Sequence, residues 1–230
     1  MTFERLKTID QLPLFPLPVV LFPGVPLPLL IFEPRYRQLL ADISVGNRLF
    51  GLSFFDPESS STDLPPIGHV GCVAEVTEVQ PLPDGRSNIM TVGVIRYHLD
   101  SYVDRGDPYL VGNVTCFEDE PGDEQELRRS AEIAAETFLR IARAVRTISG
   151  GQTVLPEMPV DSPERLSFLI AGAMDVENEM KLELLEMRST AMRLERLMEL
   201  LSRAVGDYEE RARIHVVAKS NGHGGKKIIQ

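Results

Sequence analysis

Cysteine, lysine and long apolar runs are scarce in this sequence of 230 residues, and each scarcity argues against a class of protein. The two cysteines, Cys72 and Cys116, lie in β-like runs and are expected to be buried free thiols, as is usual in a cytoplasmic protein of this size. Prolines interrupt the apolar stretches before they reach the ~18 residues of a membrane-spanning helix. Residues 1–10 carry charges where a signal peptide needs an apolar core. We therefore expect a cytoplasmic protein without a membrane segment.

The motifs of ATP hydrolysis and of Ser-Lys peptide cleavage are also missing. No G-x-x-x-x-G-K-S/T segment occurs, and such a loop is what cradles the phosphates of ATP. A Ser-Lys dyad needs a lysine on a rigid element. The lysines of the chain are Lys7, Lys181, Lys219, Lys226 and Lys227. One lies near the start, one on an expected helix and three in the tail, so we predict no catalytic residues and no cofactor.

Four residues of the first half have side chains that can bind metals, namely His69, Cys72, His98 and Cys116. His69 and Cys72 are three positions apart, and on a strand this spacing directs the two side chains to opposite faces. Ordinary packing explains these residues better, and we predict no metal site. The net charge of −10 argues against nucleic acid as the main partner, because duplex binding needs several cations on one face.

The first half of the chain, residues 10–118, has the pattern of strands and tight turns. The expected strands are short and bounded by turn residues, and they lie within 12–32 and at 49–55, 68–80, 86–99 and 109–117. The prolines of 12–32 favour edge-type or bulged strands, because proline cannot donate to a central ladder. Residues 33–43 have the apolar spacing of a short amphipathic helix. These elements are enough for a closed or nearly closed barrel, which protects strand edges.

The second half, residues 119–205, changes to a helical period. Apolar residues between 127 and 148 recur alternately four and three positions apart, which places them on one face of a helix. A second helix starts after Asp161 and Ser162 and runs to about Met174. A third and longest helix is expected over 180–205, where the same spacing continues. We predict a three-helix bundle followed by a partly disordered tail at 206–230, of which 220–227 has a linker's composition.

Several segments form a distinctive signature. They read LPLFPL at 12–17, VLFPG at 20–24, LPL at 27–29, IFEPRY at 31–36, IG at 67–68, AEV at 74–76, LPDGR at 82–86 and GVIRY at 93–97. The helical residues 181–197 agree as well. Over about residues 10–203 the sequence resembles the N-terminal substrate-binding domain of Lon proteases.

The resemblance implies a fold of the α+β class, a PUA-like β pseudo-barrel followed by a C-terminal α-helical bundle. It also implies capture of unfolded or disordered polypeptide segments. The ATPase and peptidase parts of a Lon protease are not expected in this chain. The implied role is a non-catalytic recognition module, with an adaptor or regulator of proteolysis as one option and a separately encoded protease or chaperone as its partner.

The predicted binding surface is a groove between the barrel and the bundle. Apolar contacts are assigned to Phe32, Tyr36, Met90 and Tyr97, and contacts to carboxylates or backbone to Arg35, Arg37 and Arg96. The alternative for each of these residues is ordinary packing, with Phe32 and Met90 in the core and Arg35 in a local cap or ion pair.

Three further hypotheses stay open. PUA-like folds commonly bind structured RNA, and Arg86, Arg96 and Arg105 could form a local basic patch. A free-standing protease, the least favoured hypothesis, would have to cleave peptide bonds without ATP. The apolar face beyond about Leu197 has few residues left to cover it, so we also predict a homodimer through the C-terminal helix.

Overall fold

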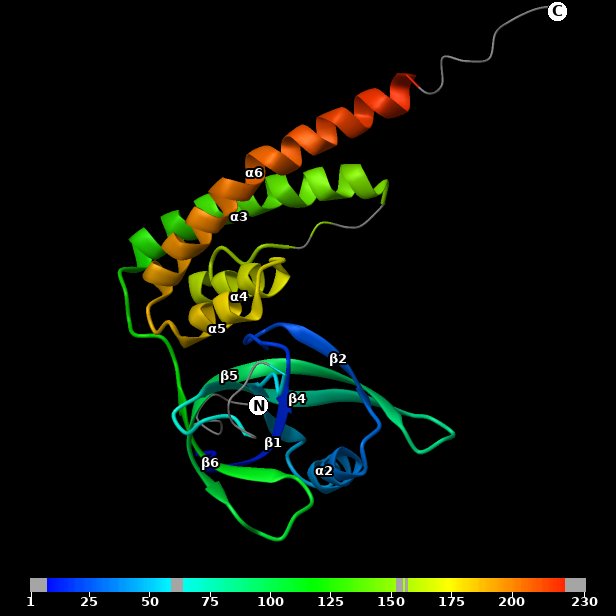
Figure 1. The fold of residues 1–230 in the computed structure, drawn as a ribbon. Coiled ribbons are helices and arrows are strands. Elements are labelled where there is room, and N and C mark those ends of the chain that lie inside the picture. Colours follow the sequence, from blue (N-terminus) through cyan, green and yellow to red (C-terminus); the bar gives the residue numbers. More distant parts are fainter. Residues whose placement is uncertain (1–7, 59–63, 152–154, 156, 222–230) are drawn as a thin grey trace, which may run out of the picture. The chain divides into compact units, whose positions relative to one another are not determined.

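The computed structural model describes residues 8–58, 64–151, 155 and 157–221 (Figure 1). The chain divides into two compact units. The β unit comprises Met1–Glu120 and Ala171–Arg188, and the helical unit comprises Pro121–Ile170 and Ser189–Gln230. The fold is of the predicted α+β class, because a six-stranded sheet precedes the long C-terminal helices.

The strands of the β unit form one sheet. They are β1 (Gln11–Leu17), β2 (Pro26–Ile31), β3 (Leu49–Phe54), β4 (Val70–Pro81), β5 (Ser87–Val103) and β6 (Leu110–Phe117). Their order is β2-β5-β4-β3-β1-β6, and β5 also pairs with β6. This additional pairing closes β5, β4, β3, β1 and β6 into a ring, whereas β2 extends β5 outside it. The closed barrel confirms the expectation from the sequence.

β1 shows how a proline-containing strand can be paired on both sides. Its first half pairs with β6 and its second half with β3. The carbonyl of Asp10 accepts a hydrogen bond from β6, and that of Leu17 accepts one from the residue after β3. Even-numbered residues therefore face β6 and odd-numbered residues face β3, so Pro13 and Pro16 face positions where no pairing exists. The prediction of an edge-type strand is wrong for β1, because this stagger accommodates both prolines.

β2 is an edge strand of the described sheet, as its prolines predict. The carbonyl of Val25 accepts a hydrogen bond from Gly93 at 3.1 Å, so the odd-numbered residues of this segment face β5. Pro26 and Pro28 consequently face the free edge, where neither can donate to an added strand.

Two clusters of buried apolar side chains lie on the two faces of the sheet. The barrel interior contains Leu12, Leu14, Leu49, Val73, Ile95, Tyr97, Leu99 and Val114. The other cluster joins the opposite face to the buried side of α2 (Pro34–Ser44), the helix that the sequence predicts. Its Tyr36 ring packs on Phe15 with ring centroids 3.9 Å apart. α2 is thereby anchored to the sheet by an aromatic pair.

The second segment of the β unit contains the end of α4 (Pro163–Ala173) and α5 (Asn178–Glu186). The Asn178 side chain donates to the carbonyl of Pro18 at 3.0 Å. The predicted division into residues 10–118 and 119–205 therefore needs a correction, because residues 171–188 belong to the same compact unit as the strands.

Two helices dominate the helical unit, α3 (Glu124–Ser149) and α6 (Thr190–Asn221), and they run side by side in the same direction (Figure 1). The Asp123 side chain caps α3, and Gly150, at φ 63°, ends it. On the buried side of α3 the four fully covered residues are alanines, which lets α6 approach closely. None of the helices that the structure describes is long and apolar enough to cross a membrane.

The remaining predictions for the helices need correction. The expected helix at 180–205 is two helices, α5 and α6, so the second half of the described chain has four helices, α3 to α6, where the sequence predicts three. The chain is extended at Met187, with φ −59° and ψ 123°. The tail predicted from residue 206 is also wrong in its first part, because α6 is helical to Asn221. Arg140 of α3 donates to Glu209 of α6 at 2.8 and 3.0 Å, which ties this part of α6 to α3. The linker predicted up to residue 227 lies largely outside the described residues.

Candidate protein-binding surface

The two halves of β5 have different neighbouring strands, and an irregularity in the sheet separates them. Val73 of β4 pairs with Ile95, and the next residue, Ala74, pairs with Gly93, so Val94 is left without a partner. Beyond this bulge the second half of β5 belongs to the closed barrel. The first half lies between β2 and β4 in a three-stranded ribbon.

One face of this ribbon exposes apolar side chains together with a few polar ones. Register places Pro26, Val92 and Glu75 in one row across the three strands, and Pro28, Met90 and Glu78 in the next. Paired residues share a face. The alternation along β2 adds Leu30, which is 43% exposed, and continues to Phe32, which is 55% exposed. The row of Leu30 continues through Asn88 of β5 to Gln80 of β4, and both of these polar residues are exposed. We call the following residues the ribbon face: Pro26, Pro28, Leu30, Phe32, Glu75, Glu78, Gln80, Asn88, Met90 and Val92.

The other face of the same ribbon is covered. Ile31 of β2, Ile89 of β5 and Val76 of β4 are buried in the cluster under α2. The ribbon face therefore has a rigid support, since its strands are held from behind by a packed core.

Four of the predicted binding residues lie on or beside the ribbon face. Phe32 and Met90 belong to it, with Met90 half-buried between β2 and β4. Arg37 is exposed and donates to the carbonyl of Phe32 at 2.9 Å. Arg35 is also exposed, and it pairs with Glu33 at 2.9 Å while lying 4.5 Å from the centroid of the Tyr36 ring. A contact of these four residues with a ligand stays a prediction.

Tyr36 and Tyr97, two further predicted residues, are buried. Tyr36 faces the sheet from α2, and burial raises the pKa of its hydroxyl. Tyr97 lies in the barrel interior, where its hydroxyl and that of Ser53 share a hydrogen bond of 2.7 Å. Burial raises the pKa of Tyr97 as well. The assignment of both residues to a binding surface is corrected, because packing encloses their side chains.

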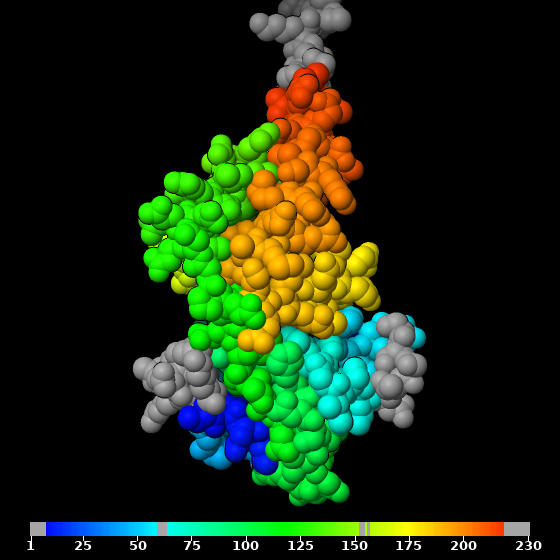
Figure 2. Space-filling model, turned by 90° about the vertical axis from the view of Figure 1, so that its left-hand side faces the viewer, coloured from blue at the N-terminus to red at the C-terminus, as the bar shows by residue number. Residues whose placement is uncertain are grey.

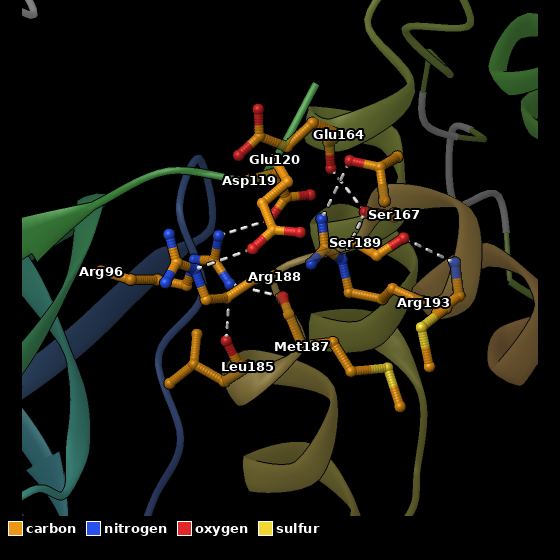
Figure 3. A network of polar contacts seen from close by, with 12 residues as sticks. Arg96, Asp119, Glu120, Glu164, Ser167, Leu185, Met187, Arg188, Ser189 and Arg193 are labelled. Atoms are coloured by element: carbon orange, nitrogen blue, oxygen red, sulfur yellow. Dashed lines mark hydrogen bonds and ion pairs between the residues drawn. The ribbon is translucent and has the colours of Figure 1, made fainter. Parts of the chain in front are cut away.

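The seventh predicted residue, Arg96, is 1% exposed and holds the β unit together (Figure 3). Its guanidinium pairs with the buried carboxylate of Asp119. It also donates to the carbonyls of Leu185 at 2.9 Å and Met187 at 2.6 Å, at the end of α5. The ring of Phe117 lies against it, with the centroid 4.5 Å away. The prediction of a surface contact is corrected, because the guanidinium satisfies carbonyls that the end of α5 leaves without partners.

The residues that follow Asp119 and Met187 in the sequence are also joined to each other, at the surface. The backbone N–H of Glu120 donates to the carbonyl of Arg188 at 2.7 Å. Figure 2 shows the green linker after β6 beside the amber segment that follows α5. The two segments of the β unit are thus joined inside by Arg96 and outside by backbone pairing.

The helical unit has a buried arginine of its own, Arg193, with no exposed surface. Its Nε donates to the hydroxyl of Ser167 at 2.8 Å, and its guanidinium lies 3.9 Å from the centroid of the Phe168 ring. These contacts join α6 to the part of α4 that belongs to the helical unit.

Arg86, Arg96 and Arg105, which were expected to form a basic patch for RNA, do not form one. Arg96 is buried, as described above. Arg86 pairs with Asp84 at 2.6 Å, and Arg105 pairs with Asp107 at 3.3 Å. A carboxylate therefore compensates each arginine, which removes the local positive field that phosphate binding would use.

The cysteines are free, as predicted. Burial raises the pKa of Cys72 to about 12 and that of Cys116 to about 11, so both thiols stay protonated and weakly nucleophilic at neutral pH. Among the described residues, no three His, Cys, Asp or Glu side chains gather as a metal site requires.

Comparison with known proteins identifies the family of this chain. The family model of the ATP-dependent protease La (LON) substrate-binding domain matches residues 11–203. The chain belongs to this family. The match comprises the substrate-binding part of the Lon protease and not its catalytic parts.

Curated relatives of the Lon family are longer than this chain. The Lon protease of Syntrophomonas wolfei is 24% identical over 218 residues, which cover 94% of this chain and 27% of the relative. The Lon protease of Parabacteroides distasonis is 31% identical over 138 residues, which cover 59% of this chain and 16% of the relative. The chain thus spans about a quarter of these relatives or less.

Solved structures of Lon N-terminal domains share the fold. A Lon N-terminal domain protein from Xanthomonas campestris has a TM-score of 0.63 at 24% identity, covering 83% of this chain and 98% of its own. The N-terminal domain of the Mycobacterium avium complex Lon protease has a TM-score of 0.61 at 16% identity, covering 84% and 98%.

Of the ribbon face, only Phe32 and Met90 are among the binding residues predicted from the sequence. The signal is hidden because every residue of 26–32 is apolar, so alternation between an inner and an outer face cannot be seen there. The register of β2 against β5 separates the two faces. It also brings Glu75 and Glu78, which are distant in sequence, beside the prolines of β2.

Proposed function

We propose that this chain is a polypeptide-recognition module and that the ribbon face binds extended apolar segments of unfolded proteins. The carrying observation is that the face exposes the apolar side chains of Leu30 and Phe32 and is supported by a packed core behind it. The family supports this proposal, since the matched model is a substrate-binding domain. In this role the module acts as an adaptor or regulator that passes bound polypeptides to a separately encoded protease or chaperone.

The edge of β2 favours recognition through side chains. Pro26 and Pro28 remove two backbone donors from the free edge, so an incoming strand cannot pair along its length. A ligand would instead lie across the strands and place its apolar side chains on Leu30, Phe32 and Met90. Full burial of such side chains contributes about 1.5–3 kcal/mol each. Association costs at least about 4 kcal/mol, so we expect a Kd of about 0.2 mM or weaker.

The test is binding of a labelled, unstructured apolar peptide, measured by fluorescence anisotropy. The double variant Leu30→Ser/Phe32→Ser should bind at least about tenfold more weakly, because two apolar contacts are lost. The control is Ile133→Ser/Met192→Ser in the helical unit, whose side chains are 56% and 62% exposed. Unchanged affinity in the first variant, or equal losses in both, would refute the proposal.

We also propose that the far end of the α3–α6 pair forms the homodimer predicted from the sequence. Val145 of α3 is 42% exposed, and Ile214 and Val217 of α6 are 59% and 52% exposed. A second copy could cover these side chains with its own. Light scattering should show dimers at about 100 μM that are lost in Val145→Glu/Ile214→Glu, since a buried unpaired charge is costly. A strict monomer at that concentration would exclude the dimer.

A further inference from the structure

The ribbon face carries two carboxylates beside its apolar side chains. Glu75 stands next to Val92, and Glu78 stands next to Met90, in adjacent rows of the sheet. Glu78 is exposed and Glu75 is half-buried. Neighbouring strands lie about 4.8 Å apart, so each carboxylate is one strand away from an apolar side chain of β5.

Other surface carboxylates of the β unit differ from these two. Glu33, Asp84 and Asp107 each pair with an arginine two positions away. Neither Glu75 nor Glu78 forms an ion pair with another residue that the structure describes. A cation brought by a ligand would therefore find two acceptors that no described arginine or lysine occupies.

We infer that the ribbon face selects polypeptide segments in which a lysine or arginine stands two positions away from an apolar residue. This inference rests on the proposed function and names its class of ligand. Residues i and i+2 of an extended chain lie about 6.8 Å apart on one side, a span that joins an apolar contact on β5 to a carboxylate on β4. An apolar segment followed by Asp or Glu meets like charge at the same place.

The effect is modest because the carboxylates are close to solvent. Each exposed pair contributes little, and two pairs together should change affinity by about fivefold. Salt should reduce the preference, since exposed charges are screened.

The experiment compares three unstructured peptides with identical apolar residues and with Lys, Gln or Glu at each second position. Anisotropy titrations at about 0.05 M and 0.5 M salt should rank affinity as Lys above Gln above Glu, with the ranking compressed at high salt. The variant Glu75→Gln/Glu78→Gln should bind the Lys and Gln peptides equally. The control Glu132→Gln/Glu195→Gln, on exposed positions of the helical unit, should keep the ranking.

The outcomes separate the selectivity from the proposed function. Equal binding of all three peptides, with loss of binding in Leu30→Ser/Phe32→Ser, would refute the selectivity and leave apolar recognition intact. A Lys preference that survives Glu75→Gln/Glu78→Gln would also refute it, because the carboxylates would not be its cause. Failure of all three peptides to bind would overturn both proposals.

Discussion

The two halves of β5 present the same face of the sheet to different surroundings. In the barrel half, Ile95, Tyr97 and Leu99 are at most 3% exposed. In the ribbon half, Met90 and Val92 remain partly open, since none of the described strands closes over them. Polar groups on this face follow the same division, since the Tyr97 hydroxyl has a buried partner in Ser53 whereas Glu75 and Glu78 have no ion partner among the described residues. Closure of the barrel buries the apolar side chains of one half of β5, and the other half keeps part of its apolar side chains exposed.

Among substitutions in the two halves of β5, Arg96→Met in the barrel half should lower the free energy of unfolding most. Removing the guanidinium leaves the carboxylate of Asp119 buried without its cation, which costs about 3–5 kcal/mol. Urea unfolding should show this as a lower midpoint. The double variant Arg96→Met/Asp119→Leu should recover part of the loss, and Arg86→Met, at an exposed pair, should cost less than about 1 kcal/mol. Equal losses at the exposed and buried arginines would contradict the role of Arg96.

Gly71→Ala should have the next largest effect. A β-carbon at Gly71 would lie 2.6 Å from the carbonyl oxygen of Leu52 and would overlap the ring of Tyr97. Such overpacking costs about 1–3 kcal/mol in unfolding free energy. Gly46→Ala is the control, because its nearest neighbour would lie 3.7 Å away. If both substitutions lower the urea midpoint equally, the barrel interior is less tightly packed than described.

A smaller effect should follow the protonation of His69, at the barrel end near β5. Its Nε2 is buried without a hydrogen-bond partner among the described residues, and burial lowers the pKa of the imidazole. The unfolded chain, with a pKa of about 6.5, then binds the proton more readily than the folded chain. Stability should fall as pH decreases below about 6.5. Urea midpoints between pH 7.5 and 5.5 should fall more steeply for the wild type than for His69→Gln, and parallel curves would exclude His69 as the cause.

The smallest effect on stability should come from the ribbon face itself. Leu30→Ser and Phe32→Ser remove side chains that are already partly in water, so each should change the unfolding free energy by about 0.5 kcal/mol or less. Their effect on peptide binding should nevertheless be the strongest of all the variants. A large loss of stability would mean that the ribbon face is part of the core.

Much of the fold could be predicted because its signals are local. Turn residues mark the β4–β5 hairpin, Asp123 caps the start of α3, and Pro163 stands at the start of α4. The break between α5 and α6 could not be predicted in this way. The apolar spacing runs through it, and its stabilising contacts come from Arg96, about 90 residues earlier in the chain.

The candidate site was predictable only in part for the same reason. Phe32 and Met90 are apolar residues that sequence reasoning selects, and both lie on the ribbon face. Tyr97 has a similar character, yet the pairing of β5 with β6 encloses it. Whether an alternating strand turns its apolar side to solvent depends on which distant strand closes over it, and local pattern does not contain that information.

The contacts of Arg96 also determine when, during synthesis of the chain, the β unit can finish folding. Its carbonyl partners belong to Leu185 and Met187, which follow the first segment of the helical unit, Pro121–Ile170, in the sequence. A ribosome must therefore deliver the chain past residue 188 before the β unit can complete its interior. A fragment that stops at residue 120 would keep Arg96 and Asp119 but lose the carbonyls of Leu185 and Met187, so we expect it to be less stable than the complete β unit.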